Sequence, residues 1–213
     1  MKENNSKLIG LLLIITFFIG FTLYQNNKED LITKRAKITS GRIYSLSYKN
    51  PHRGSGKSID YKYFINNNEY KSKDPFSKHQ TFKKRVRLSE PIIGKFYPVE
   101  YDSLNPKESR IIITEEALNP FELTHNGLKI NGDISKISGG HNPYFDFFIT
   151  YKFRGEKFSF RTRLHQDSIN CGSIENCRKT KKIELKISEE YPFFNDLYFK
   201  SRDRQKFKAL YSK

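Results

Sequence analysis

The sequence predicts a mainly β protein in which an N-terminal transmembrane helix precedes two small antiparallel β-sheet units, sandwich-like or barrel-like, derived from an internal duplication. Three observations support this prediction. Leu8–Tyr24 contains no charged residue. The chain is rich in aromatic residues, with 18 Phe and 13 Tyr among 213 residues, and such side chains suit the half-buried surface of a sheet. Finally, the strand patterns of the first half recur in the second half.

Leu8–Tyr24 is long enough to cross a bilayer as a helix. The uncharged stretch continues to Asn27 and rises about 30 Å at 1.5 Å per residue, which matches the thickness of the hydrocarbon core. Two lysines precede it, as in a signal peptide, but no small-residue cleavage pattern follows. We therefore favour an uncleaved anchor (residues 1–27) over a cleaved signal, followed by a polar linker (residues 28–36).

The charges around this segment allow two orientations. Two lysines precede the segment, whereas five basic residues follow it: Lys28, Lys34, Arg35, Lys37 and Arg42. A count of Lys and Arg alone places the C-terminal side in the cytoplasm. A short basic tail before a lone span usually stays in the cytoplasm, however, and the body is then carried across. We adopt this second orientation, a single-pass membrane protein with an extracytoplasmic body.

The first β unit is predicted over residues 37–114. Its clearest element is Ser58–Ser72, which begins with apolar residues at every second position: Ile59, Tyr61, Tyr63 and Ile65. Three asparagines follow, and because Asn tolerates a left-handed backbone, a hairpin turn is expected there. The other strands of this unit are predicted at Lys37–Tyr48, Lys84–Ser89, Phe96–Asp102 and Arg110–Thr114.

Residues 115–126 are predicted to form a connector, and residues 127–213 to form a second β unit that repeats the first. Five segments match in the same order, with insertions confined to loops, which indicates a duplication. They are Gly132–Ile137 with Gly41–Leu46, Phe147–Phe153 with Ile59–Ile65, Phe158 with Tyr70, Leu185–Glu189 with Val86–Glu90, and Leu197–Ser201 with Val99–Ser103.

Four parts of the first unit carry a resemblance to a known family: Ser40–Ile43, the Gly/Ser loop Arg53–Gly56, Tyr61–Asn67 with Tyr70, and the closing segment Gly94–Pro106. Through these parts, the stretch from about Ala36 to Ile113 resembles the bacterial "domain of unknown function 3592" family, and the second unit resembles a diverged copy. The resemblance implies a small β domain tethered to a membrane. It implies no catalytic residues.

The formal net charge of +16 favours anionic partners such as lipid head groups, an acidic envelope polymer or nucleic acid. Because basic residues occur in every segment, a merely solubilising surface is the alternative. The C-terminal tail could form an amphipathic helix on an anionic surface, or be a solvated end. Its candidate contact residues are Lys200, Arg202, Arg204, Lys206 and Lys208.

Few residues are candidates for site chemistry. Cys171 and Cys177 are the only cysteines and are expected to form a disulfide if the body lies outside the cytoplasm, with free thiols as the alternative. Arg53–Ser58 looks like a phosphate loop, but it lacks the first glycine and precedes a strand rather than a helix. The five histidines stand apart in predicted loops. We therefore predict no catalytic, cofactor-binding or metal-ligating residue.

The function that these patterns favour is a non-catalytic binding or structural module anchored in a membrane. The first alternative is an enzyme, or an enzyme partner, that acts on an anionic envelope polymer. The further alternative is a nucleic-acid-binding protein with a cytoplasmic body, since basic and aromatic residues interleave near Phe153–Arg163. Nucleic acid is the less favoured partner, because alternation along a strand puts the rings and the charges on opposite faces.

Overall fold

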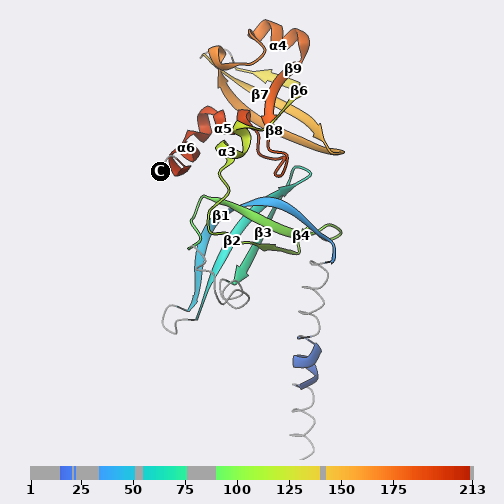
Figure 1. The fold of residues 1–213 in the computed structure, drawn as a ribbon, viewed down its shortest axis with the longest axis vertical. Coiled ribbons are helices and arrows are strands. Elements are labelled where there is room, and N and C mark those ends of the chain that lie inside the picture. The colour runs from blue at the N-terminus through green and yellow to red at the C-terminus, as the bar shows by residue number, and fades with distance from the viewer. Residues whose placement is uncertain are drawn as a thin grey trace, which may run out of the picture.

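A computed structural model shows a mainly β protein with two antiparallel sheets, one above the other along the long axis (Figure 1). The structure describes residues 15–20, 22, 34–50, 55–75, 90–139 and 143–211. The first sheet has strand order β3-β2-β1-β4-β5, and the second has strand order β8-β7-β6-β9. The prediction of a mainly β chain with two antiparallel units is therefore confirmed.

Most of the predicted anchor, Leu8–Tyr24, lies outside the described residues. In the part of the chain that the structure describes, no helix combines the length and the apolar character that a membrane span needs. The predicted strand Lys84–Ser89 also lies outside the described residues, as do Arg53 and Gly54 of the loop Arg53–Gly56.

The first sheet is built around the predicted hairpin. Tyr61 and Tyr63 of β2 are fully buried, as their alternation predicts, and Asn66 and Asn67 have φ angles of 48° and 64°. Two successive positive φ angles are what a tight two-residue hairpin requires, so this prediction is confirmed. The strands of the sheet are β1 (Ala36–Asn50), β2 (Ser55–Ile65), β3 (Asn68–Pro75), β4 (Phe96–Asp102) and β5 (Ser109–Ile111).

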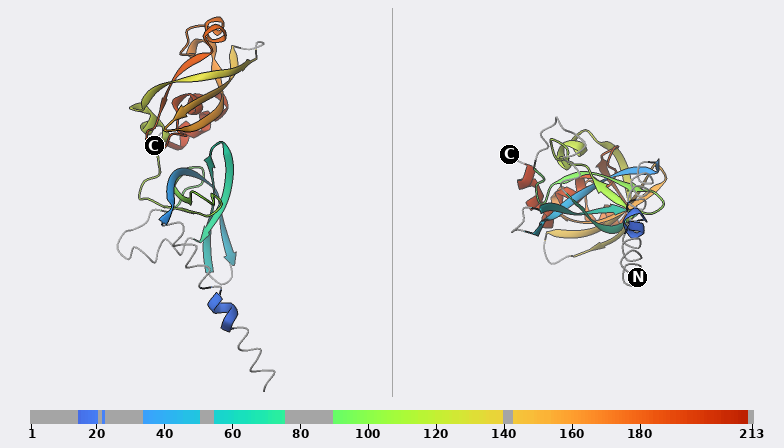
Figure 2. Two further views of the ribbon diagram at one scale, coloured as in Figure 1. Left: turned by 90° about the vertical axis from the view of Figure 1, so that its right-hand side faces the viewer. Right: turned by 90° about the horizontal axis from the view of Figure 1, so that it is seen from below.

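The second sheet has a similar meander, and four short helices accompany it. Its strands are β6 (Leu128–Ser138), β7 (Tyr144–Phe153), β8 (Glu156–His165) and β9 (Lys182–Ile187). The helices are α3 (Pro120–His125), α4 (Ile174–Thr180), α5 (Asp196–Lys200) and α6 (Gln205–Tyr211), with 3-10 turns η1 (Gln166–Ser168) and η2 (Arg202–Arg204). The C-terminal helices lie on the side of the second sheet that faces the first sheet (Figure 2).

The central strands of the two sheets correspond closely. Each central pair has a register shift at the matching place, after Ile43 in β1–β2 and after Ile134 in β6–β7. Tyr63 and Tyr151 each donate a hydroxyl hydrogen to a proline carbonyl at 2.5 Å. Each of these tyrosines also stacks on the ring across its hairpin, at centroid distances of 5.6 and 5.2 Å. The predicted register of the hairpin match is therefore correct.

Two of the later matches are wrong. β9 pairs with β6 as β4 pairs with β1, so Leu185–Glu189 corresponds to β4 and not to Val86–Glu90. Leu197–Ser201 forms α5 and its cap instead of a strand. In the first sheet the chain turns into β5, whereas in the second it makes one bridge at Asn195, whose side chain then caps α5. A five-residue apolar pattern cannot distinguish a strand from one helical turn.

Two glycines allow the central strands to pack against their neighbours. A Cβ atom at Gly41 would lie 2.4 Å from Val99 Cγ2, and one at Gly132 would lie 2.7 Å from Ile149 Cγ2. Neither distance is compatible with an unshifted neighbour. Both sheets therefore use glycine at the corresponding position of their central strand, where a side chain of the adjacent strand comes closest.

We expect Gly41→Ala to lower the free energy of unfolding by about 1–3 kcal/mol, because the new methyl group overpacks the core. Urea denaturation measures this loss. The double variant Gly41→Ala/Val99→Ala provides the control, since removal of the clashing methyl groups should make its loss smaller than the sum of the two single losses. Strictly additive losses would contradict the close approach.

Candidate functional site at the junction of the sheets

An aromatic cluster joins the two sheets. Phe96, at the start of β4, meets Phe194 and Phe199 edge to face, with ring centroids 5.0 and 5.9 Å apart. All three rings are buried, and Phe207 of α6 packs beside them. Edge-to-face packing is a favoured arrangement of aromatic pairs and adds to the free energy of burying their area. The junction is therefore a hydrophobic core in its own right, and it fixes one sheet against the other.

A polar contact ties the sheet edges together beside this cluster. The Asn67 side chain accepts a hydrogen bond from Ser159 N at 2.7 Å and donates one to Lys157 O at 3.3 Å. Both partners belong to β8, the outer strand of the second sheet. The side-chain amide of Asn67 thus forms the two hydrogen bonds that the backbone of one residue in a neighbouring strand would form. This pairing and the ion pair of Lys37 with Glu156, at 3.7 Å, are polar contacts between the two units.

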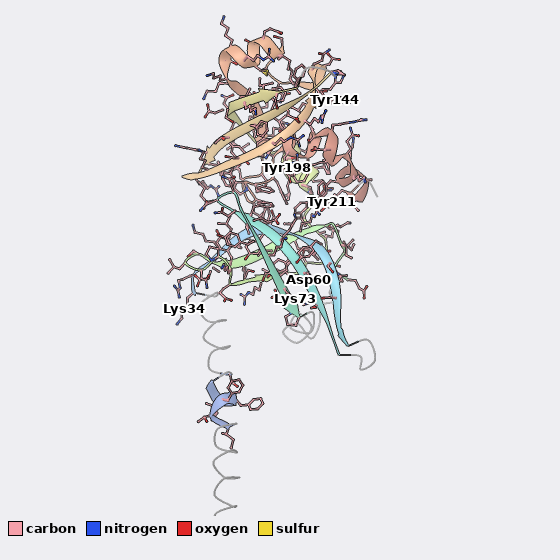
Figure 3. The ribbon with its side chains drawn as sticks, turned by 180° about the vertical axis from the view of Figure 1, so that it is seen from behind. Lys34, Asp60, Lys73, Tyr144, Tyr198 and Tyr211 are labelled. Carbon is pink, nitrogen blue, oxygen red and sulfur yellow. A yellow bond between two sulfur atoms is a disulfide. The ribbon has the colours of Figure 1, made fainter. Side chains whose placement is uncertain are left out.

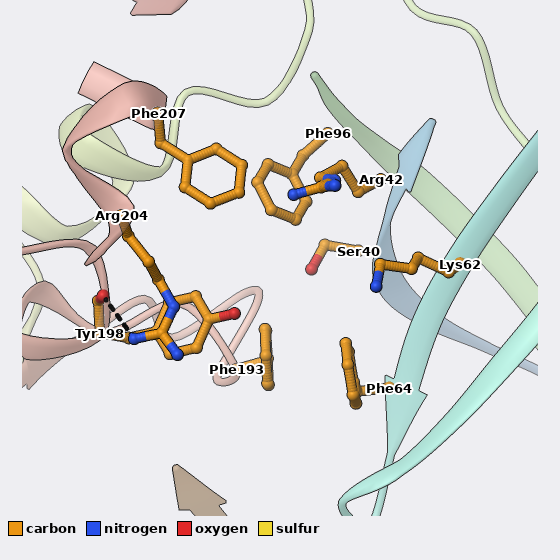
Figure 4. Close-up of a pocket in the computed structure, with 9 residues that line it drawn as sticks. All are labelled: Ser40, Arg42, Lys62, Phe64, Phe96, Phe193, Tyr198, Arg204 and Phe207. Atoms are coloured by element: carbon orange, nitrogen blue, oxygen red, sulfur yellow. Dashed lines mark hydrogen bonds between the residues drawn. The ribbon is translucent and has the colours of Figure 1, made fainter. Parts of the chain in front are cut away.

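A cavity of about 160 Å³ lies at the junction (Figure 4). An engineered cavity of about 150 Å³ holds one benzene molecule, so this space suits one small group. The polar face of the first sheet and the C-terminal segment both contribute to its wall. The lining residues are Ser40, Arg42, Lys62, Phe64, Phe96, Phe193, Tyr198, Arg204 and Phe207.

The first-sheet residues of this wall lie opposite the tyrosine core. Arg42 pairs with Lys62 across β1 and β2, one position away from Gly41 and Tyr61, which face the core. Their side chains therefore project from the other face of the sheet, toward the C-terminal segment. Seen from behind, Tyr198 and Tyr211 of that segment lie between the two sheets (Figure 3).

Three cationic side chains line the cavity, and two of them stack on rings. The guanidinium carbon of Arg204 is 3.9 Å from the centroid of Tyr198, and that of Arg42 is 5.0 Å from the centroid of Phe207. Stacking occupies the face of a guanidinium and leaves its N–H groups directed sideways. The Arg204 and Lys62 side chains point into the shared space in Figure 4.

The charges of the cavity are only partly neutralised by carboxylates. Lys62 Nζ lies 2.7 Å from Glu69 Oε2, and this hydrogen bond is the main cause that lowers the pKa of Glu69. Arg204 is 3.8 Å from Asp203, a carboxylate that binds Arg161 more closely, at 2.7 Å. Arg42 forms no ion pair with any described residue. Within the described residues, the guanidinium of Arg42 lies over the ring of Phe207, and its charge also acts on the Glu69 carboxylate.

Two polar atoms in the cavity wall have no hydrogen-bond partner, Ser40 Oγ and Arg42 Nε. Both are buried atoms, and the whole Ser40 residue is only 5% exposed. A buried polar group that lacks a partner costs about 1–3 kcal/mol, and more if it is charged. The Ser40 hydroxyl is directed toward the cavity (Figure 4). An acceptor atom in the cavity could satisfy both groups.

The structure divides the five basic residues of the tail among different environments. Arg204 lines the cavity and donates to the carbonyl of Arg161 at 2.9 Å. Lys200 pairs with Asp196 at 2.6 Å, and Arg202 lies over the ring of Tyr144. Lys206 and Lys208 are exposed on α6. These residues do not share one face, so their contact with an anionic surface stays a prediction.

The sequence analysis missed Ser40, Arg42 and Lys62 as site residues. All three lie in predicted strands, and their alternation with buried residues placed them together on one polar face. That signal was available, but these three residues were not singled out from the other basic and polar residues of the chain. What the pattern does not contain is the docking of the C-terminal segment, which turns this exposed face into the wall of a cavity.

The remaining candidates lie away from the junction. Cys171 and Cys177 are joined in a disulfide, with Cα atoms 5.4 Å apart, and Cys177 is buried in the core of the second sheet. Across the described ranges, no group of three or more His, Cys, Asp and Glu side chains is placed to hold a metal ion.

Comparisons with known proteins do not assign a family to this chain. No protein-family model matches the chain, and no curated protein matches it. A solved structure of a replication protein A heterotrimer bound to single-stranded DNA is 12% identical, over 72% of this chain and 45% of that one, with a TM-score of 0.22. A structure described as the molecular basis for abrogation of activation of pro-inflammatory cytokines is 11% identical. The match covers 70% of this chain and 80% of that one, with a TM-score of 0.21.

The chain therefore spans less than half the length of the replication protein A chain that it matches. Both TM-scores are too low for either likeness to bear on the fold or the function of this protein.

Tyr211 gives the junction a measurable dependence on pH. Its hydroxyl accepts a hydrogen bond from Phe96 N at 3.0 Å. Burial raises the pKa of Tyr211 to about 12, although the bond from Phe96 acts in the opposite direction. Because the folded-state pKa lies above the unfolded value of 10.0, the neutral phenol stabilises the fold below pH 10, and this contribution is lost as the pH rises toward 12.

We expect Tyr211→Phe to be less stable than the wild type at pH 8 by about 1 kcal/mol, the net value of a typical hydrogen bond. The difference should shrink between pH 10 and pH 12, the window set by the two pKa values. Urea denaturation at each pH measures it, and Tyr44→Phe, which removes an exposed hydroxyl, is the control. A difference that stays constant across this window would show that Tyr211 does not titrate as described.

Proposed function

We propose that this chain is a non-catalytic binding module that takes up an anionic group at the junction of its two sheets. The observation that supports the proposal is the convergence of Arg42, Lys62 and Arg204 on one cavity. Guanidinium and ammonium groups with free N–H edges are the common recognition elements for carboxylates, sulfates and phosphates.

The make-up of the cavity supports binding over catalysis. Its ionisable lining groups are two guanidiniums, an ammonium and the phenol of Tyr198, whereas general acid–base catalysis uses a group poised near the working pH. Ser40 is the one hydroxyl that resembles a nucleophile. Its Oγ has no hydrogen-bond partner, so no base is placed to activate it.

We propose further that the body is held at a membrane by Leu8–Tyr24 and lies outside the cytoplasm. The disulfide between Cys171 and Cys177 supports this side, because disulfides persist in oxidising compartments. Acidic lipids and envelope polymers would then be the available anionic partners, and a nucleic acid would not. An enzyme that acts on such a polymer is not favoured by any feature of the cavity.

The two β units are proposed to derive from one ancestral unit, at about residues 37–114 and 127–213. The register shifts after Ile43 and Ile134, together with the two tyrosine–proline hydrogen bonds, support this origin. Membership of the first unit in the "domain of unknown function 3592" family remains a proposal that rests on its sequence pattern.

The anchor predicts that the full chain stays with the membrane fraction after extraction with alkaline carbonate, because a transmembrane helix cannot be washed off. A variant that lacks residues 1–27 should appear in the soluble fraction. Release of the full chain by carbonate would refute the anchor and leave only peripheral attachment.

The binding function predicts that the full chain in detergent binds polyphosphate through the cavity. The triple variant Arg42→Gln/Lys62→Gln/Arg204→Gln should bind at least about tenfold more weakly, because a hydrogen bond to a charged group contributes about 1.5–3 kcal/mol. Isothermal titration at fixed salt measures the affinity, and a thermal melt verifies that the variant is folded.

The matched control removes three exposed charges that lie outside the cavity, as Lys107→Gln/Lys152→Gln/Lys179→Gln. It changes the net charge by the same amount and should reduce affinity far less. Equal losses in the two triple variants would mean that net charge attracts the polymer without a site, and the proposal would then fail.

A further inference from the structure

The cavity has a more specific chemistry than a general preference for anions. Its polar donors come from different directions, with Ser40 and Arg42 on β1, Lys62 on β2 and Arg204 on η2. A planar carboxylate presents its two oxygens in one plane. A tetrahedral oxyanion presents oxygens in several directions and matches donors that surround it.

The unpaired groups specify where such an anion would lie. The Ser40 hydroxyl and Arg42 Nε–H are both donors, both buried and both without an acceptor. They project from alternate positions on the same face of β1, so a ligand with more than one acceptor atom suits the pair. These two groups lack partners in a protein whose other buried side-chain polar atoms, within the described residues, are satisfied.

The charge of the cavity fits more than one negative charge. Arg42 has no carboxylate partner among the described residues, and Arg204 shares Asp203 with the closer Arg161. Lys62 forms an ion pair with Glu69 at 2.7 Å. Three cations at the cavity therefore face two carboxylates that each have other partners, and this excess of positive charge suits the dianionic form of a phosphate monoester.

The volume of the cavity and the aromatic rings in its wall indicate what is attached to the phosphate. The cavity of about 160 Å³ is larger than a phosphate needs, and its remaining wall is aromatic. The rings of Phe64, in the first unit, and Phe193, in the second unit, stack on each other. Their centroids are 5.0 Å apart and their planes are nearly parallel. The two rings together form a floor to which both units contribute. A small organic group attached to the phosphate would lie against this floor.

From these four observations, we infer that the junction cavity is a binding site for a phosphate monoester group, held by Ser40, Arg42 and Arg204, with its small organic substituent against Phe64 and Phe193. This inference rests on the proposed binding function and names its ligand class. The phosphate can belong to a soluble ester or to a lipid head group, since both present the same dianion.

Isothermal titration of the full chain in detergent with glycerol 3-phosphate tests the soluble source. We expect one binding site per chain. Acetate should bind about tenfold more weakly than glycerol 3-phosphate, because it offers fewer acceptor atoms and less charge. Arg42→Gln should weaken the binding of glycerol 3-phosphate by about tenfold or more, whereas Lys179→Gln, at an exposed residue of α4, should not change this affinity measurably. No heat of binding from glycerol 3-phosphate, or equal losses in both variants, would overturn the inference.

Ser40→Ala is the sharpest variant because it should have opposite effects on binding and on stability. The ligand-free variant should be as stable as the wild type or more stable, since an unpartnered buried hydroxyl has been removed. Its affinity for glycerol 3-phosphate should fall by about threefold to tenfold. A variant that loses stability while keeping its affinity would show that Ser40 has a structural role and would refute its part in the site.

Vesicles with and without phosphatidic acid test the lipid source. If the head group enters the cavity, binding of the full chain to vesicles that contain this lipid falls in Arg42→Gln and is displaced by glycerol 3-phosphate. Vesicle binding that resists both changes would place the contact elsewhere and would count against a lipid ligand at this site.

The results also separate this inference from the proposed function. Polyphosphate binding that depends on the three cavity cations, without any affinity for glycerol 3-phosphate, would overturn the ligand class and leave the binding function standing. Loss of polyphosphate specificity as well would overturn both.

Discussion

The packing of Phe96 between the two sheets is the contact on which the rest of this structure depends. Its ring meets Phe194 and Phe199 of the second unit, its N–H group is bound by Tyr211, and its carbonyl accepts from Leu118 in the connector. One residue therefore joins a strand end, the connector and both C-terminal helices. Because the cations of the cavity come from both sides of this contact, their convergence is a consequence of where Phe96 holds the two sheets.

The rings also explain how positive charge can be kept at an interior surface. An arginine removed from water normally needs a carboxylate, because desolvation of the charge is costly. At this junction, Phe207 and Tyr198 stand in for part of that compensation. A carboxylate would neutralise the guanidinium, whereas a ring leaves its charge and its N–H edge accessible. The aromatic content of the chain therefore serves a second purpose besides building the cores of the sheets.

Much of the fold could be predicted from the sequence because it is local. Alternation fixed the buried faces of β2 and β7, and Asn66 and Asn67 fixed the hairpin turn. The cavity could not be predicted, because it depends on contacts between residues more than a hundred positions apart, such as Phe96 with Tyr211. The helix α5 was missed for another reason: Asn195 caps it after a single bridge, and one turn of helix buries Leu197 and Phe199 much as a strand would.

The pairing of Asn67 with β8 has a consequence for how molecules of this protein meet one another. An open strand edge is a template on which a second chain can add a strand, and natural proteins block such edges to remain dispersed. Here Asn67 satisfies Lys157 O and Ser159 N, and the C-terminal segment satisfies Arg161 O and Arg163 N. The arrangement of the two sheets within one chain thereby protects the second sheet against edge-to-edge polymerisation between chains, which matters most for proteins crowded on a surface.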